Sequence, residues 1–120
     1  MTALRAKTPS ARGRASKRRG AQDERDVARI IGGRRHLADT GGPEDIRHDW
    51  LAVQVKGGGA VVTRAMRDGH AQAVTAAGGH HKLAAVVLVD RRGTRLRRYI
   101  AFELQEYANW MGIKPTEDDE

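Results

Sequence analysis

The chain has 120 residues, no cysteine and only five aromatic residues of the Phe, Trp and Tyr types. This length predicts one small domain rather than a two-domain enzyme, and the lack of thiols excludes disulfides, thiolate zinc sites and cysteine nucleophiles. Lys and Arg number 22 against 15 Asp and Glu, so the formal net charge is +7, which favours an acidic partner.

The first twenty residues carry the whole excess of positive charge. They contain seven Lys and Arg residues and no acid, whereas residues 21–120 contain fifteen of each sign. Because this segment has no hydrophobic periodicity, we expect residues 1–20 to be a disordered basic arm in isolation. Its composition favours binding to nucleic-acid phosphates, although a solubilising tail has the same composition. The residues assigned to this contact are Arg12, Arg14, Lys17, Arg18 and Arg19.

The apolar residues predict one folded domain over residues 21–113. Of the 22 Leu, Ile, Val and Phe residues, 21 lie in this stretch, which is enough for a compact core. Residues 114–120 are acidic, and we expect them to form a solvated tail. Neither an apolar run of about 18 residues nor the hydrophobic centre of a signal peptide is present, so we expect a cytoplasmic protein without a membrane partner.

The hydrophobic pattern predicts the order helix, strand or strands, helix, strand, strand, helix. The expected helices span residues 21–31, 64–77 and 103–111. The expected strands span residues 34–38, 51–56, 83–89 and 94–102. Thr63 is expected to cap the second helix, and the apolar run at residues 83–89 is typical of a central strand covered on both faces. This order predicts an α/β fold with a small mixed β-sheet flanked by helices.

Polar side chains from three stretches are predicted to meet at one site. Glu24 shares a helix face with apolar residues, which costs free energy unless the carboxylate finds a partner or acts as a helix-start acid. Gln54 and Lys56 emerge side by side from a strand, and if Ile46–Asp49 makes a tight turn into that strand, Asp45 and Gln54 lie on neighbouring strands. Such oxygens suit Mg²⁺ or Mn²⁺, and Lys56 would stabilise an oxyanion. Taken singly, Asp45 also suits a turn and Lys56 a solvated strand end.

Three segments, GAQDERDVARIIGGRR, GPEDI and WLAVQVK, followed by a helix and an apolar strand, resemble the PD-(D/E)XK nuclease superfamily. Within it they are similar to the archaeal-type Holliday junction resolvases and their small bacteriophage relatives, over roughly residues 18–111. The resemblance implies a restriction-endonuclease-like core in which Glu24, Asp45, Gln54 and the main-chain carbonyl of Val55 bind Mg²⁺ or Mn²⁺. Lys56 matches the motif lysine, and Gln54 stands where the family usually has a glutamate.

The resemblance also implies a function. The chain would be a homodimeric, metal-dependent endonuclease that hydrolyses phosphodiesters of four-way junctions or other branched DNA in recombination and repair, in the host cytoplasm if it is phage-encoded. Further DNA contacts are expected at Arg34, Arg35 and Gln72. The candidates for the dimer face are Trp50, Tyr99, Phe102 and Trp110.

Two other functions agree with the same residues. A non-catalytic nucleic-acid-binding protein with a degenerate nuclease fold is favoured by Gln54, which brings no charge to a metal. It would use the basic arm and a second basic cluster, although that cluster also suits protection of an edge strand against aggregation. The cluster consists of Arg91, Arg92, Arg95, Arg97 and Arg98. A small ribosome-associated protein agrees with the size and basicity but leaves Glu24 unexplained.

Overall fold

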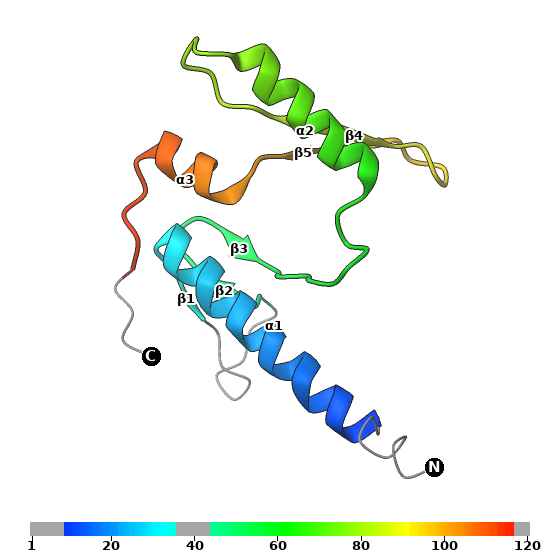
Figure 1. The fold of residues 1–120 in the computed structure, drawn as a ribbon, viewed down its shortest axis with the longest axis vertical. Helices are drawn as coiled ribbons and strands as arrows, with labels where there is room; N and C mark the ends of the chain where they lie inside the picture. The colour runs from blue at the N-terminus through cyan, green and yellow to red at the C-terminus, as the bar shows by residue number, and fades with distance from the viewer. Residues whose placement is uncertain (1–8, 36–43, 117–120) are drawn as a thin grey trace. The chain divides into compact units, whose positions relative to one another are not determined.

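The computed structural model describes residues 9–35 and 44–116, and the chain divides into two compact units. Unit 1 comprises Met1–Gly57 and Lys114–Glu120, and unit 2 comprises Gly58–Ile113. The division falls inside the single domain expected over residues 21–113, in a run of three glycines that gives the backbone great freedom. The described part is a mixed α/β fold with three helices, as the sequence predicts, but its strands form two small antiparallel sheets in place of one mixed sheet (Figure 1).

Unit 1 packs one long helix on a small sheet. Helix α1 (Pro9–Ile31) is followed by β1 (Arg34–Arg35), β2 (Ile46–Arg47) and β3 (Ala52–Val53), and the strand order is β1-β2-β3. Among the described residues of this unit, the buried side chains are Ala28 and Ile31 on α1 and Ile46 on β2. Removing these apolar groups from water is the main force that holds the helix to the sheet.

The first helix begins earlier than its hydrophobic pattern indicates. It starts at Pro9, so residues 9–20 are helical and differ from the expected disordered arm, while residues 1–8 lie outside the described residues. Proline is well tolerated in the first turn of a helix, and the Lys and Arg residues that follow are good helix formers. Because the amphipathic part at residues 21–31 already forms a helix, its extension needs no new nucleus.

The β2–β3 hairpin places the polar residues of unit 1. Ile46 pairs with Val53 and Arg47 with Ala52. The predicted alternation holds over residues 51–56. Half-buried residues are Leu51, Val53 and Val55, and exposed residues are Ala52, Gln54 and Lys56. The regular strand is shorter than expected, and residues 36–38 of the expected first strand lie outside the described residues.

Unit 2 contains α2 (Arg64–Ala77), β4 (Val86–Asp90), β5 (Arg97–Ala101) and α3 (Leu104–Met111). The predicted cap of α2 is confirmed, because the Thr63 hydroxyl accepts a hydrogen bond of 3.2 Å from the Met66 amide. The small residue Gly69 lets α2 approach β4 closely, since a Cβ added there would lie 3.3 Å from Val86 Cγ1.

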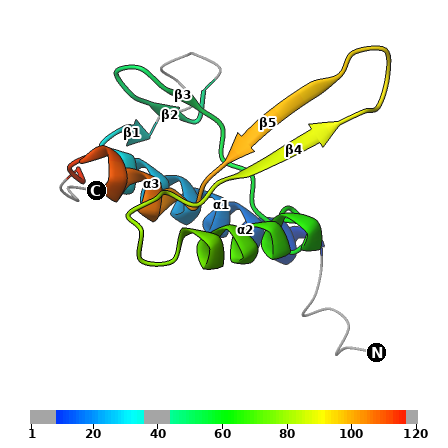
Figure 2. The same cartoon turned by 90° about the horizontal axis from the view of Figure 1, so that it is seen from above.

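Strands β4 and β5 form a two-stranded hairpin whose turn end extends away from α2 and α3 (Figure 2). The expectation of a strand covered on both faces is wrong for the described residues, because Val87 is 57% exposed and Val89 44% exposed. Helix α2 covers only the face that carries Val86 and Leu88. A continuous apolar run therefore does not require two covered faces. Met111 at the end of α3 is also exposed.

Gly33 provides a test of the packing in unit 1. A Cβ added at Gly33 would lie 2.8 Å from the Arg47 carbonyl oxygen and 2.9 Å from Ile46 Cγ2. We predict that Gly33→Ala lowers the free energy of unfolding by about 1–3 kcal/mol, the usual cost of overpacking. The measurement is urea denaturation followed by circular dichroism.

Gly20→Ala is the matched control, because nothing lies within 4 Å of the added Cβ on α1. This change should stabilise the helix by about 0.5–1 kcal/mol, since alanine loses less conformational entropy than glycine. Equal effects of the two substitutions would contradict the close approach of Gly33 to β2.

Candidate functional site

Asp45 directly precedes β2, at the open end of the β2–β3 hairpin. Its amide donates a hydrogen bond of 2.8 Å to the Val53 carbonyl, and its Oδ2 accepts one of 2.7 Å from the Val55 amide. Ile46 pairs with Val53, so these two bonds hold Asp45 beside the segment that continues β3 as far as Val55. Within the described residues, the side-chain bond uses only one of the two carboxylate oxygens, so the other is available to a cation.

Glu24 forms an ion pair inside unit 1. Its Oε1 lies 2.7 Å from Arg35 Nε, and the two side chains are 24% and 25% exposed. This pair answers the question raised by a carboxylate on an apolar helix face, because the half-buried charge has a partner on β1. Arg35 is in register with Ile46, the residue after Asp45. Glu24 and Arg35 thus form a pair on α1 and β1, and Asp45 lies one residue before the β2 position that faces Arg35.

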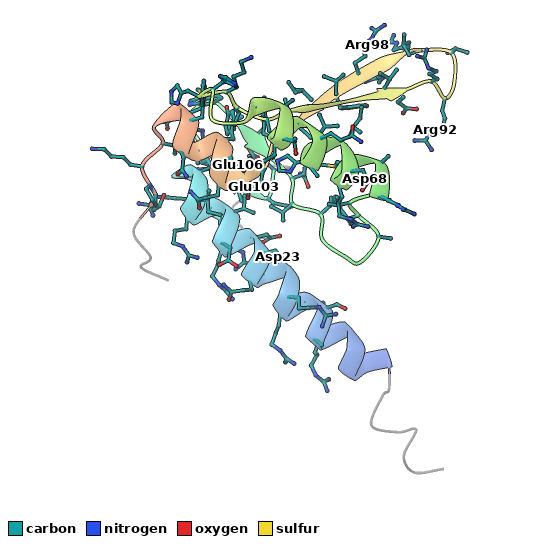
Figure 3. The ribbon with its side chains drawn as sticks, turned by 45° about the horizontal axis from the view of Figure 1, so that its top comes forward. Asp23, Asp68, Arg92, Arg98, Glu103 and Glu106 are labelled. Atoms are coloured by element: carbon teal, nitrogen blue, oxygen red, sulfur yellow. The ribbon has the colours of Figure 1, made fainter. Side chains whose placement is uncertain are left out.

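Asp23 is a residue of this region that the sequence pattern missed. A Cβ added at Gly57 would lie 2.8 Å from Asp23 Oδ2, so this carboxylate reaches the backbone directly after Lys56. Figure 3 shows Asp23 on α1. Asp23 lies four residues before Val27 and seven before Ile30, so its spacing places it at the apolar side of the helix, as the spacing of Glu24 does. The glycine run at residues 57–59 is a second local signal, because it permits another group to approach the chain closely.

Gln54 and Lys56 both lie on the exposed face of the strand segment, as the alternation predicts. Val55 lies between them, is half-buried and donates its amide to Asp45. The main-chain carbonyl of Val55 and the side-chain amide of Gln54 are neutral oxygen donors. Lys56 adds an ammonium group to a strand end that also has the Asp23 carboxylate nearby.

These oxygens suit a hydrated hard cation. Mg²⁺ and Mn²⁺ accept one or two carboxylates together with carbonyl oxygens and water, which are the donors offered by Asp45, Gln54 and Val55. Glu24 fits less well, because Arg35 already neutralises its charge. No group of three or more His, Cys, Asp or Glu side chains suitable for a metal is present among the described residues, and the set expected here contains only two such carboxylates.

The residues expected to contact DNA lie on several elements. The side chains of Arg14, Lys17, Arg18 and Arg19 are exposed on α1. Arg12 belongs to the same helix, but its side chain lies outside the described residues. Arg34 is exposed, whereas Arg35 is half-buried against Glu24. Gln72 is exposed on α2 and therefore belongs to unit 2.

Comparison with known proteins adds no family to this description. No protein-family model, curated protein or solved structure matches the chain. Over residues 9–35 and 44–116, none of the helices combines the length and the apolar character needed to cross a membrane. The chemistry assigned to the site thus rests on its own residues and contacts.

The hydrogen bond from the Val55 amide to Asp45 predicts different costs for two substitutions. Asp45→Ala leaves that amide without its acceptor and should lower the free energy of unfolding by about 1–3 kcal/mol. Asp45→Asn keeps an acceptor oxygen and should cost less than half as much. Chemical denaturation of both variants checks this order, and equal losses would mean that the hydrogen bond does not contribute.

Proposed function

We propose that the chain is a metal-dependent, structure-selective DNA endonuclease of the Holliday junction resolvase type, which hydrolyses phosphodiesters of branched DNA. The observation that carries the proposal is the β2–β3 hairpin. Asp45 precedes β2 and bonds through its amide to Val53 and through its carboxylate to Val55, the residue between Gln54 and Lys56. This arrangement supports the resemblance to the PD-(D/E)XK superfamily, whose fold is part of the proposal.

In this function the hairpin holds the reacting groups. Asp45 supplies the charged oxygen for Mg²⁺ or Mn²⁺, and the side-chain carbonyl of Gln54 and main-chain carbonyl of Val55 supply neutral ones. The cation, when bound, activates water and neutralises charge on the phosphate. Lys56 orients the attacking water or stabilises the negative charge that develops on the phosphodiester. Val55 donates its amide to Asp45 and so fixes the direction of that carboxylate.

Glu24 has two roles in this proposal. As a metal ligand, it must exchange Arg35 for the cation. In the described arrangement its bond of 2.7 Å to Arg35 supports a second role, in which it orients a guanidinium beside the scissile phosphate. Arginine suits that task because its planar fork matches two phosphate oxygens.

The DNA substrate is proposed on the basis of charge. Exposed arginine and lysine side chains on α1 present positive charge to phosphates, and contacts of this kind read the shape of DNA rather than its base sequence. Because resolution of a junction requires two cuts and the chain offers one site, the proposed enzyme is a homodimer. Trp50, Tyr99 and Trp110 are exposed and remain candidates for its interface, whereas Phe102 is half-buried and stacks on Tyr107.

A second candidate function is non-catalytic binding of nucleic acid. It is supported by the fact that both carboxylates already have protein partners. Asp45 accepts a hydrogen bond from the Val55 amide, and Glu24 forms an ion pair with Arg35. Gln54 adds no charge that would require a cation. A hairpin satisfied in this way keeps its shape without a metal, and the exposed basic residues of α1 would still bind phosphates.

Incubation of the purified protein with a labelled four-way junction, in Mg²⁺ or Mn²⁺, tests the first function. We expect cleavage of the junction in preference to a linear duplex of the same sequence. Asp45→Asn and Lys56→Ala should each lower the rate by about 10²-fold or more, because each removes charge stabilisation from the transition state. Cleavage that persists in a chelator, or in the double variant, would contradict the mechanism.

Gln54→Glu separates the two functions. If the site is impaired only by its neutral ligand, the added charge should raise the cleavage rate about 10-fold or more and lower the Mg²⁺ concentration needed. Gln105→Glu, the same change at an exposed position on α3, is the control and should leave the rate unchanged. Junction binding without cleavage by either the native protein or Gln54→Glu would favour the non-catalytic function.

A further inference from the structure

The turn end of the β4–β5 hairpin concentrates positive charge. It carries Arg91, Arg92, Arg95, Arg97 and Arg98, which we call the arginine turn. All five side chains are exposed, and Asp90 is the only acid in residues 90–98. Figure 3 shows Arg92 and Arg98 at this end of the hairpin. The turn therefore has an excess of four positive charges over nine residues.

Asp90, the single acid of this segment, is already paired with an arginine of the turn. Asp90 accepts a hydrogen bond of 3.0 Å from the Arg92 amide and lies 3.3 Å from Arg92 Nε. These two hydrogen bonds lower the pKa of Asp90, so the pair remains charged. Among the described residues, the other four arginines have no acidic side chain within ion-pairing distance. Like charges at this density repel one another, so the arrangement favours a polyanionic partner.

Protection of an edge strand explains this cluster poorly. A charge that guards an edge belongs on the apolar strand that would otherwise pair with another chain. Both strands of this two-stranded sheet are edges, and residues 86–89 of β4 carry no charged side chain although Val87 and Val89 are exposed. The arginines lie instead in the turn and in the first two residues of β5. Lysine is the residue usually used as a guard, and the turn contains none.

We propose that the arginine turn is a binding site for the phosphate backbone of duplex nucleic acid. It shares the class of partner with the proposed function, but it requires neither a metal nor a working hairpin site in unit 1. Arginine forms two parallel hydrogen bonds to a phosphate, and a two-stranded antiparallel ribbon is narrow enough to lie along a groove of a duplex. The bond between Asp90 and Arg92 holds the turn, and Arg91, Arg95 and Arg98 supply the contacts.

The test measures binding without cleavage. Fluorescence anisotropy with a labelled linear duplex in EDTA gives the Kd of the full chain at several salt concentrations. The test variant carries Arg91→Gln, Arg95→Gln and Arg98→Gln. The matched control carries Arg64→Gln, Lys82→Gln and Lys114→Gln, which removes the same charge from exposed positions outside the turn. Circular dichroism verifies that both variants are folded.

The expected results are a loss of affinity of about 10-fold or more for the turn variant and a flatter dependence on salt. Each phosphate contact contributes about 0.9 to the slope of log K against log salt, so three contacts contribute about 2.7. For the control variant, the change in log Kd should be less than a third of the change measured for the turn variant. Equal losses in both variants, or native affinity of the turn variant, would overturn the proposal.

An anionic membrane surface is the alternative polyanionic partner of the arginine turn. Sedimentation with vesicles that contain phosphatidylserine, in the same buffer, measures the binding of the protein to such a surface. If the turn variant loses vesicle binding and keeps duplex binding, the arginine turn is a lipid contact and the proposal is overturned. Since every measurement is made in EDTA, a failure of the nuclease activity leaves this test unaffected. Conversely, the cleavage experiment with Asp45→Asn does not depend on the arginine turn.

Discussion

The two hydrogen bonds of Asp45 are the constraint on which unit 1 depends. One uses its main-chain amide and the other its carboxylate, and together they tie both Val53 and Val55 to the end of β2. A strand slipped by one residue turns all its side chains to the opposite face. The strands themselves are only two residues long, so their own ladder specifies register weakly. By holding the register, Asp45 keeps Gln54 and Lys56 on the exposed face.

The same carboxylates serve the fold and the proposed chemistry. Asp45 needs only one oxygen for Val55, which leaves the other oxygen for a substrate or ion. Glu24 is more committed, because it neutralises Arg35 in a half-buried position, where an unpaired charge is costly. Of the two, Asp45 is thus better suited to a reaction, and Glu24 is better suited to holding Arg35 in place. The neutral side chain of Gln54 makes this difference important, because it leaves Asp45 as the main source of negative charge.

Local signals predicted the helices of unit 2 and the exposed positions of β3. Thr63 and Gly78 cap the two ends of α2 through hydrogen bonds to residues of the adjoining turn. Because these bonds are local, the sequence alone was sufficient to predict where α2 begins and ends. The start of α1 at Pro9 was missed because a helix can extend through a segment that has no apolar face. The exposure of Val87 and Val89 was missed because an apolar run does not reveal which elements will cover it.

For the candidate site, the sequence indicated that Glu24 needed a partner but not that the partner is Arg35. It placed Asp45 and Gln54 on neighbouring strands only on condition that residues 46–49 form a tight turn, whereas Ile46 and Arg47 form β2 and the connection to β3 spans residues 48–51. The approach of Asp23 to Gly57 depends on how a helix lies against a distant strand end, and no local pattern contains that information. Contacts between separate stretches of chain are thus where prediction from sequence ended.

The partners of Asp45 and Glu24 have a consequence for how the apoprotein behaves. Zinc fingers remain unfolded until the ion arrives, because their ligands have no other means of being brought together. Here the Val55 amide and the Arg35 guanidinium already hold the two carboxylates in place, so the sheet forms without an ion. For the proposed metal-dependent function, this means that folding and ion affinity are nearly independent quantities, and removal of the ion leaves the hairpin in place.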